Sequence, residues 1–216
     1  MFKRLSILFV GLALTAACSA RPADDASAAT YTDGQQYVAT TTRARLDPKD
    51  GKVEVVEVFS YGCVHCAHYE EYAEKLQKEL PKGVVFHAVP AAFNDAWLPY
   101  AQAYYAARTL KVAPASHAAL FKAIHTDHYP LRTIEELADW YKANYAVDPA
   151  KFIAAAKSDA VKNRILEDTK LIQGWGIDGT PTIVVDGKYR SNQIKNFDEL
   201  NGVAKYLTDK ELKGNK

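Results

Sequence analysis

The sequence contains few cysteines and has no strong excess of either charge. Only three cysteines occur among 216 residues, too few for the dense disulfide network that holds small secreted domains together. Lys and Arg number 27 and Asp and Glu number 26, which gives a net charge of +1. A nearly neutral chain has no electrostatic attraction to nucleic acid, so we expect no such partner. Hydrophobic residues make up 48% of the chain, which argues against disorder and predicts a globular protein.

Long hydrophobic runs are equally scarce. One apolar run, residues 5–14, follows the basic pair Lys3 and Arg4. It is about half as long as the roughly 20 residues that span a bilayer, but a short basic segment followed by such a run is typical of an export signal. We therefore predict a signal peptide over residues 1–20 and an exported protein.

The end of the signal peptide has two interpretations. The motif Leu-Thr-Ala-Ala-Cys18 resembles the lipobox of bacterial lipoproteins, in which the cysteine is lipidated and becomes the first residue, although Thr15 stands where leucine is usual. The alternative is ordinary cleavage after Ala17 or Ala20, with no role for Cys18. Residues 21–34 are rich in Ala, Asp, Ser and Thr and predict a flexible linker, which suits either case.

The remaining chain alternates between strand and helix patterns. β-Branched segments at 53–59 and 84–89 flank a helical stretch at 63–80, and a strand–helix–strand unit of this kind predicts two parallel strands. Asp186-Gly187 predicts a tight β-hairpin near the end of the chain. The other expected elements are strands at 36–41, 182–185 and 188–190, and helices at 97–110, at 116–125, from Thr133, at 148–173 and at 196–207.

This order of elements predicts an α/β protein with an interrupted sheet domain. We expect the first part of that domain at residues 35–93 and its second part at residues 166–212. The residues between them, 94–165, form an all-helical insertion in this interpretation.

Cys63 and Cys66 have the spacing C-x-x-C at the predicted start of a helix. Free N–H groups and the helix dipole at a first turn favour an anion, so Cys63 is expected to be an accessible thiolate that exchanges with disulfides. Cys66 lies one turn later on the same face, and we expect it to be less accessible and to resolve the mixed disulfide.

Other uses of this cysteine pair fit less well. Zinc normally needs four ligands, and only His68 is well placed nearby. A c-type haem needs C-x-x-C-H, whereas Ala67 follows Cys66 here. A purely structural disulfide would close a loop too short to stabilise the fold by much. We therefore expect no metal, and no cofactor besides a redox-active Cys63–Cys66 disulfide.

Two neighbouring residues are candidates for tuning the pair. His65 lies between the cysteines and can donate a hydrogen bond, or place positive charge, near the Cys63 thiolate, although it also fits a solvated histidine. Glu57 shares its strand face with apolar residues, and burial would raise its pKa so that it could take the proton of Cys66. The alternative for Glu57 is an edge carboxylate that points into solvent, as we expect of Glu54.

Thr180-Pro181 directly precedes the strand expected at 182–185. Proline cannot donate a ladder hydrogen bond, so an ordinary trans turn is one interpretation. The other is a cis peptide bond that brings this turn beside the cysteines and leaves the backbone groups of Thr180 free to pair with a substrate peptide.

Three features together resemble the DsbA family of periplasmic thiol oxidases. They are the segment Glu57-Val-Phe-Ser-Tyr-Gly-Cys63-Val-His-Cys66, the helical insertion, and Gly179-Thr-Pro181 before the hairpin, and the resemblance covers roughly residues 35–210. It implies a thioredoxin fold with an inserted all-helical domain. It also implies oxidation of reduced, newly exported proteins, reoxidation by a membrane quinone-linked partner of the DsbB type, and a periplasmic location.

The resemblance also implies a role for each matching residue. The implied roles are attacking cysteine for Cys63, resolving cysteine for Cys66, thiolate stabiliser for His65, buried acid for Glu57, cis proline for Pro181 and the residue before it for Thr180. Val64 replaces a proline that is common in this motif, and Gly62 replaces an aromatic residue found in some members. Both departures bear on the oxidising strength and leave the reaction type unchanged.

Two other functions remain open from the sequence. The first is a thioredoxin-like reductase or isomerase. Such isomerases use a dimerisation domain, for which the stretch before Val53 has no room. We expect a monomer. The second is a tethered, non-catalytic binding lipoprotein with an aromatic groove lined by Tyr61, Trp97 and Trp175.

Overall fold

A five-stranded mixed sheet forms the centre of the structure, a computed structural model that describes residues 30–49 and 51–214. The strand order is β1-β5-β4-β2-β3, and β2 and β3 are parallel, as predicted, while the other pairs are antiparallel. The strands are β1 (Tyr37–Ala39), β2 (Val53–Phe59), β3 (Val84–Pro90), β4 (Thr182–Val185) and β5 (Tyr189–Ser191). The helices are α1 (Val64–Glu79), α2 (Leu98–Thr109), α3 (Ala113–His125), α4 (Ile134–Tyr145), α5 (Pro149–Ala156), α6 (Asp159–Gly174) and α7 (Phe197–Gly214).

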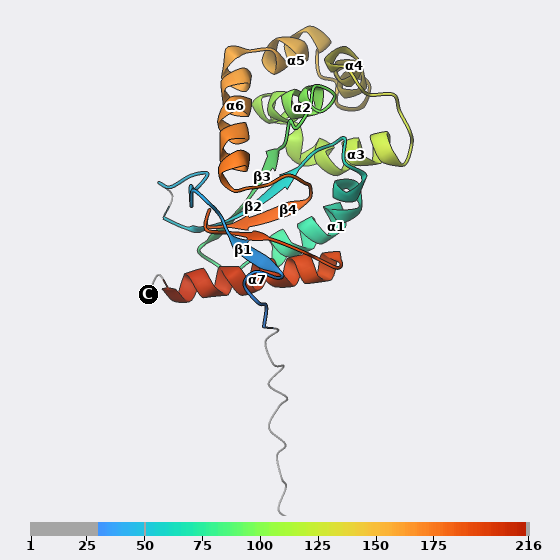
Figure 1. Cartoon of the computed structure of the whole chain (residues 1–216). Coiled ribbons are helices and arrows are strands. Elements are labelled where there is room, and N and C mark those ends of the chain that lie inside the picture. The colour runs from blue at the N-terminus through green and yellow to red at the C-terminus, as the bar shows by residue number, and fades with distance from the viewer. Residues whose placement is uncertain (1–29, 50, 215–216) are drawn as a thin grey trace, which may run out of the picture.

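Strand β2 is buried on both faces and separates two parts of the core. Val53 and Val55 pack with residues of α1 and α7, whereas Val56 and Val58 pack with residues of α6. This division follows from the alternation of side chains along a strand. In Figure 1, α7 crosses one side of the sheet and α6 rises on the other.

The helices α2 to α5 gather at one end of the sheet, as Figure 1 shows. Their apolar faces form a third part of the core, which also contains Phe59 and Tyr61 and both cysteines. Thr133 and Glu136 form the predicted capping box at the start of α4. The all-helical insertion therefore packs directly against the loop that carries the cysteines.

The single helix predicted over residues 148–173 is divided into two helices, α5 and α6. The prediction of one continuous helix was therefore wrong. Ser158 caps α6 by accepting a hydrogen bond from the backbone N–H of Val161. Helix α6 then runs unbroken across residues 165 and 166, where we expected the insertion to end. Its last turns pack Ile172 on the sheet, so one helix belongs to both parts of the molecule.

The predicted hairpin joins β4 to β5. Asp186 and Gly187 have φ values of 51° and 64°, and they form the left-handed centre of the turn that the N–H of Lys188 closes onto the carbonyl oxygen of Val185. A Cβ atom at Gly187 would lie 2.3 Å from the carbonyl oxygen of Ala44. Glycine is therefore needed here for both its conformation and the close approach of a neighbouring segment.

The described part of the chain begins at residue 30, inside the predicted linker. The Tyr31 ring packs edge-to-face on Tyr206 of α7, with a centroid distance of 5.6 Å. The predicted signal peptide, Cys18 and the rest of the linker lie outside the described residues. The last helix extends past the predicted end near residue 207, to Gly214.

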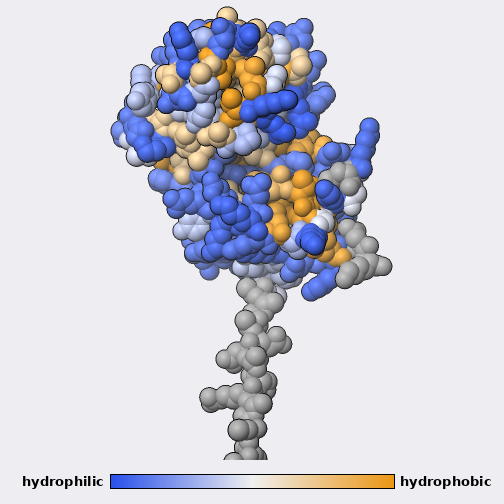
Figure 2. All heavy atoms as spheres, turned by 180° about the vertical axis from the view of Figure 1, so that it is seen from behind, coloured by the Kyte–Doolittle hydropathy of each residue, from blue (hydrophilic) through white to orange (hydrophobic). Residues whose placement is uncertain are grey.

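Figure 2 shows the molecule from behind, where hydrophobic patches lie on both the insertion and the sheet half amid a largely hydrophilic surface. Within the described part of the chain, no helix combines the length and the apolar character needed to cross a membrane.

Candidate active site

Cys63 occupies the N-cap position of α1, at the end of a tight turn that follows β2. The turn is closed by the backbone N–H of Cys63, which donates to the carbonyl oxygen of Ser60 at 3.0 Å. The hydroxyl of Ser60 accepts from the N–H of Gly62 at 3.1 Å. The Cys63 sulfur then accepts a hydrogen bond from the backbone N–H of Cys66 at 3.4 Å. A sulfur thus takes the place that a capping oxygen usually occupies.

The surroundings of Cys63 favour its thiolate. The pKa of Cys63 is lowered to about 5, first by the hydrogen bond with the Cys66 thiol, and then by Thr180 and the backbone N–H groups of Cys66 and His65. Burial acts in the opposite direction, since the residue is 8% exposed. In its thiol form, Cys63 donates to the carbonyl oxygen of Thr180 at 3.4 Å.

Cys66 is placed to keep its proton. It is fully buried, and its pKa is raised by burial, by the hydrogen bond to Cys63 and by the charges of Cys63 and Glu57. Both cysteines are free thiols in this structure. The outer sulfur is therefore the one suited to exchange, and the inner sulfur is suited to receive a proton when a bond to it breaks.

The Thr180–Pro181 peptide bond is cis, as the second of the two interpretations of this segment predicts. It lies immediately before β4, and the hydrogen bond between Cys63 and Thr180 places the turn against the start of α1. The turn is therefore beside the redox pair.

Glu57 is buried behind the cysteine pair, with 2% of its surface exposed. Its pKa is raised well above the usual range by burial, and further by Glu70 and Cys63. The expectation for Glu54 was wrong, because that side chain is fully buried on the opposite face of β2. Glu54 lies 3.5 Å from Arg45 and accepts backbone hydrogen bonds from the segment that covers this face.

The structure places His65 at the surface, directly after Val64 in the first turn of α1. Its backbone N–H is one of the groups that lower the pKa of Cys63. The contribution of its imidazole to the thiolate stays a prediction. His68 is exposed on the same helix.

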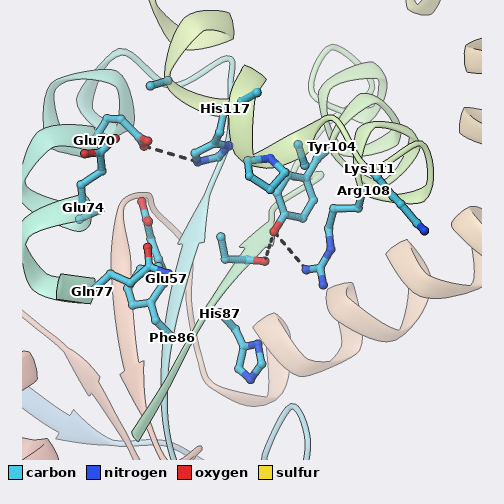
Figure 3. Close-up of a pocket in the computed structure, with 16 residues that line it drawn as sticks. Glu57, Glu70, Glu74, Gln77, Phe86, His87, Tyr104, Arg108, Lys111 and His117 are labelled. Atoms are coloured by element: carbon cyan, nitrogen blue, oxygen red, sulfur yellow. Dashed lines mark hydrogen bonds and ion pairs between the residues drawn. The ribbon is translucent and has the colours of Figure 1, made fainter. Parts of the chain in front are cut away.

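A cavity of about 610 Å³ opens behind the redox pair, between α1, α3 and β3, and Glu57 is among its lining residues. Figure 3 shows the His117 imidazole pointing toward the Glu70 carboxylate, and their closest N–O distance is 3.4 Å. Burial raises the pKa of Glu70 to about 7, with a further contribution from Glu74. Burial lowers the pKa of His117 to about 4, so its imidazole is neutral.

Sequence reasoning missed this cavity. Glu70 follows Cys66 by one helical turn, and that spacing could have placed it on the same face of α1. His117 lies on another helix, and nothing in its sequence context indicates that it reaches the active site.

Two further expectations can be compared with the structure. Tyr61 and Trp175 are buried, at 0% and 1% exposure, so the aromatic groove that we considered for a binding lipoprotein does not form from them. Among residues 30–49 and 51–214, no cluster of three or more His, Cys, Asp or Glu side chains is arranged to hold a metal ion.

Comparison with known proteins agrees with this geometry. A family model described as Thioredoxin matches residues 40–203. The thiol:disulfide interchange protein DsbA of Pseudomonas aeruginosa is 36% identical over 188 residues, which cover 86% of this chain and 88% of that protein. The protein of the same name from Burkholderia cepacia is 34% identical and covers 98% of this chain and 100% of the relative.

Solved structures show the same likeness. The crystal structure of Pseudomonas aeruginosa DsbA superposes with a TM-score of 0.79 at 35% identity, over 85% of this chain and 96% of that one. The oxidoreductase DsbA from Xylella fastidiosa superposes with a TM-score of 0.76 at 36% identity, over 83% of this chain and 96% of that one.

Proposed function

The chain belongs to the DsbA family of thiol:disulfide interchange proteins, and we propose that it works as an oxidant, which passes a Cys63–Cys66 disulfide to reduced, newly exported proteins. The observation that carries this proposal is the contrast between the two sulfurs. Cys63 has a pKa near 5 at the start of α1, whereas the buried Cys66 has a raised pKa. A stabilised thiolate favours the reduced form of the protein and therefore favours donation of the disulfide.

The exchange proceeds in two steps. A substrate thiolate attacks the Cys63 sulfur, the Cys63–Cys66 bond breaks, and Cys66 leaves as a thiolate that takes up a proton. A second substrate thiolate then attacks the substrate sulfur of the mixed disulfide, and Cys63 leaves as a thiolate. The substrate loses two electrons and gains a disulfide, and this chain gains the two electrons as a dithiol. The low pKa of Cys63 makes it a good leaving group in the second step.

Glu57 is the proposed proton donor to Cys66. Its raised pKa keeps the Glu57 carboxyl protonated, and when this carboxyl is charged it raises the pKa of Cys66. The cavity that Glu57 lines with Glu70 offers a path by which that proton is replaced from solvent. This arrangement supports general acid catalysis, for which a carboxyl with a raised pKa is required at neutral pH.

The substrate is proposed to bind at Thr180 and Pro181, where the backbone of the cis turn borders Cys63. An extended peptide pairs with such a backbone through main-chain hydrogen bonds, independently of its sequence. His65, exposed beside the sulfur, is proposed to add positive charge near the thiolate when its imidazole is protonated.

We further propose that the protein works in the periplasm as a monomer and that a membrane quinone-linked oxidoreductase of the DsbB type reoxidises it. The export signal predicted at residues 1–20 supports the location. Metabolic labelling of the full chain with palmitate, compared with Cys18→Ser, tests lipidation of Cys18. Label that disappears in the variant supports a lipid anchor, and an unlabelled wild-type protein supports ordinary cleavage.

The experiment that tests the direction of the reaction is equilibration with glutathione. Thioredoxin, a reductant, has a potential of about −270 mV. We expect a clearly higher, more oxidising potential for this chain, and a potential near that of thioredoxin would support the reductase alternative instead.

A further inference from the structure

Tyr61 is held at both ends by helix α3 of the insertion. Its hydroxyl lies 2.6 Å from Nδ1 of His117, and its backbone carbonyl oxygen lies 2.7 Å from Nε2 of His125. Tyr61 itself is fully buried and precedes Cys63 by two residues. A single residue of the redox loop therefore makes two hydrogen bonds to two histidines of one helix.

The protons of these groups can be placed so that every contact is a hydrogen bond. A carbonyl oxygen only accepts, so Nε2 of His125 carries the hydrogen. His117 is neutral, because burial lowers its pKa to about 4, so its Nδ1 either accepts from the Tyr61 hydroxyl or donates to it. In the first case the hydrogen of His117 sits on Nε2, which faces Glu70 at 3.4 Å (Figure 3), and in the second a protonated Glu70 donates to that nitrogen. Tyr61 is hydrogen-bonded at both ends in either case.

Aromatic packing keeps the Tyr61 ring in this position. The ring makes edge-to-face contacts with Phe59, His117 and Phe121, at centroid distances between 4.9 and 5.3 Å. Two of these partners also belong to α3. The position of the Tyr61 ring is consequently set by α3, and the ring in turn sets the position of the loop backbone.

The position of this backbone determines the hydrogen bonds of the Cys63 sulfur. Tyr61 lies inside the turn that the N–H of Cys63 closes onto the carbonyl oxygen of Ser60. The sulfur accepts from the N–H of Cys66 at 3.4 Å, and a rotation of the turn would misalign and weaken this hydrogen bond.

We propose that His117 and His125 are positioning residues for thiol–disulfide exchange, and that through Tyr61 they let the helical insertion hold the Cys63 sulfur on the N–H groups at the start of α1. The inference rests on the proposed function of Cys63 as the exchanging thiolate. It gives the insertion a role in the redox chemistry itself, because α3 contacts the redox loop through these two histidines. Neither histidine contacts a sulfur, so the effect is indirect.

Substitutions at both ends of Tyr61 test the inference. Tyr61→Phe keeps the ring and removes the bond to His117, and His125→Leu removes the bond to the carbonyl oxygen. Both variants are expected to raise the pKa of Cys63 by about half a unit to one unit, a threefold to tenfold loss of thiolate stabilisation. His125→Gln is expected to restore the wild-type pKa, because its side-chain amide can donate from nearly the same position. Thiolate absorbance of the reduced proteins measures the pKa.

Tyr141→Phe is the matched control. Tyr141 is also fully buried, and its hydroxyl lies 3.2 Å from that of Ser116 of α3 and not within hydrogen-bonding distance of Tyr61. We expect this variant to lose a similar amount of stability and to keep the wild-type pKa of Cys63. Tyr61→Phe retains the packing of the ring, so it carries the test even where His125→Leu fails to fold.

The possible failures are distinguishable. If wild-type Cys63 has a low pKa and Tyr61→Phe leaves it unchanged, the role of His117 is refuted, and an unchanged pKa in His125→Leu refutes the role of His125, while the proposed oxidase function stands in both cases. If Tyr141→Phe shifts the pKa as much as Tyr61→Phe does, the effect comes from general loosening and the inference is also refuted. An ordinary pKa for Cys63 in the wild-type protein would instead refute the proposed function.

Discussion

Cys63 combines partial burial with groups that stabilise its charge, and the backbone supplies part of that stabilisation. The N–H groups of Cys66 and His65 act together with the Cys66 thiol and Thr180. Backbone groups cannot be removed by substitution, so a side-chain change at position 65 leaves part of the effect in place. Individual residues therefore test the remaining contributions one at a time.

The imidazole of His65 is the first proposed contribution. His65 is exposed in the first turn of α1, two residues after Cys63, and a protonated ring near the sulfur would favour the thiolate. We expect His65→Ser to raise the pKa of Cys63 in a thiolate titration and to make the protein a weaker oxidant in equilibrium with glutathione. Equal pKa values in the two proteins would assign the thiolate stabilisation to the other groups alone.

Glu57 is the second residue whose proposed role can be tested by substitution. Glu57→Gln keeps the shape of the side chain but removes the exchangeable carboxyl proton. We expect exchange with a reduced peptide to slow by roughly 10²-fold, the lower end of what general acid–base catalysis contributes. The Cys63 pKa of the variant is measured in parallel, because Glu57 and Cys63 also interact by charge. An unchanged exchange rate would contradict the proposed proton transfer to Cys66.

Among the elements, α1 places Cys66 and Glu70 one turn apart and turns both toward the interior. Glu70 has a pKa of about 7 in the fold, against an ordinary value of 4.5. Between pH 4.5 and about 7, the folded state therefore keeps a proton on Glu70 that the unfolded state has lost. The free energy of unfolding falls as the pH rises through that window.

This sign gives a prediction for Glu70→Gln. The amide cannot ionise, so the variant should gain stability over the wild-type protein as the pH rises from about 4.5 to 7, by at most about 1.4 kcal/mol per pH unit. Above that window the difference should level off. Urea unfolding at several pH values measures it, and a difference that does not change with pH would show that Glu70 ionises normally.

Helix α4 provides a test of the insertion away from the redox site. Thr133 and Glu136 cap its first turn reciprocally. Thr133→Ala should cost about 1 kcal/mol of stability, the typical loss for a capping residue. The pKa of Cys63 should stay unchanged, because α4 does not contact the redox loop through these residues. A shifted pKa would indicate that any loosening of the insertion reaches the active site.

For the whole molecule, the strand–helix–strand unit, the hairpin and the insertion could all be predicted from sequence patterns. The break between α5 and α6 was missed, because a serine cap inside a helical pattern gives a weak signal. Glu54 was misplaced, since the segment around Arg45 that covers its face of the sheet has no local signature.

The candidate site was predictable only where a residue stands in a recognisable motif or beside a recognisable element. The motif from Glu57 to Cys66 carries its own chemistry, and Pro181 precedes a recognisable strand. His117 and His125 depend on how α3 packs against the redox loop. Single histidines on an amphipathic helix indicate no particular role, so only the three-dimensional structure brings them to the site.

The two redox states of the molecule should differ in stability. The folded reduced protein has a Cys63 pKa near 5 instead of the ordinary 9.0. This contribution to folding is complete above about pH 9, decreases as the pH falls, and is lost near pH 5. We expect the reduced protein to unfold at a higher denaturant concentration than the oxidised protein at pH 7, and the gap to narrow toward pH 5. Equal midpoints at pH 7 would argue against a strong oxidant.

The most direct test of the account is the pH titration of thiolate absorbance in the reduced wild-type protein, with Cys63→Ser as the reference that assigns the signal. The account predicts a midpoint near pH 5 that disappears in the variant. A midpoint near 9, the ordinary value for a cysteine thiol, would contradict it.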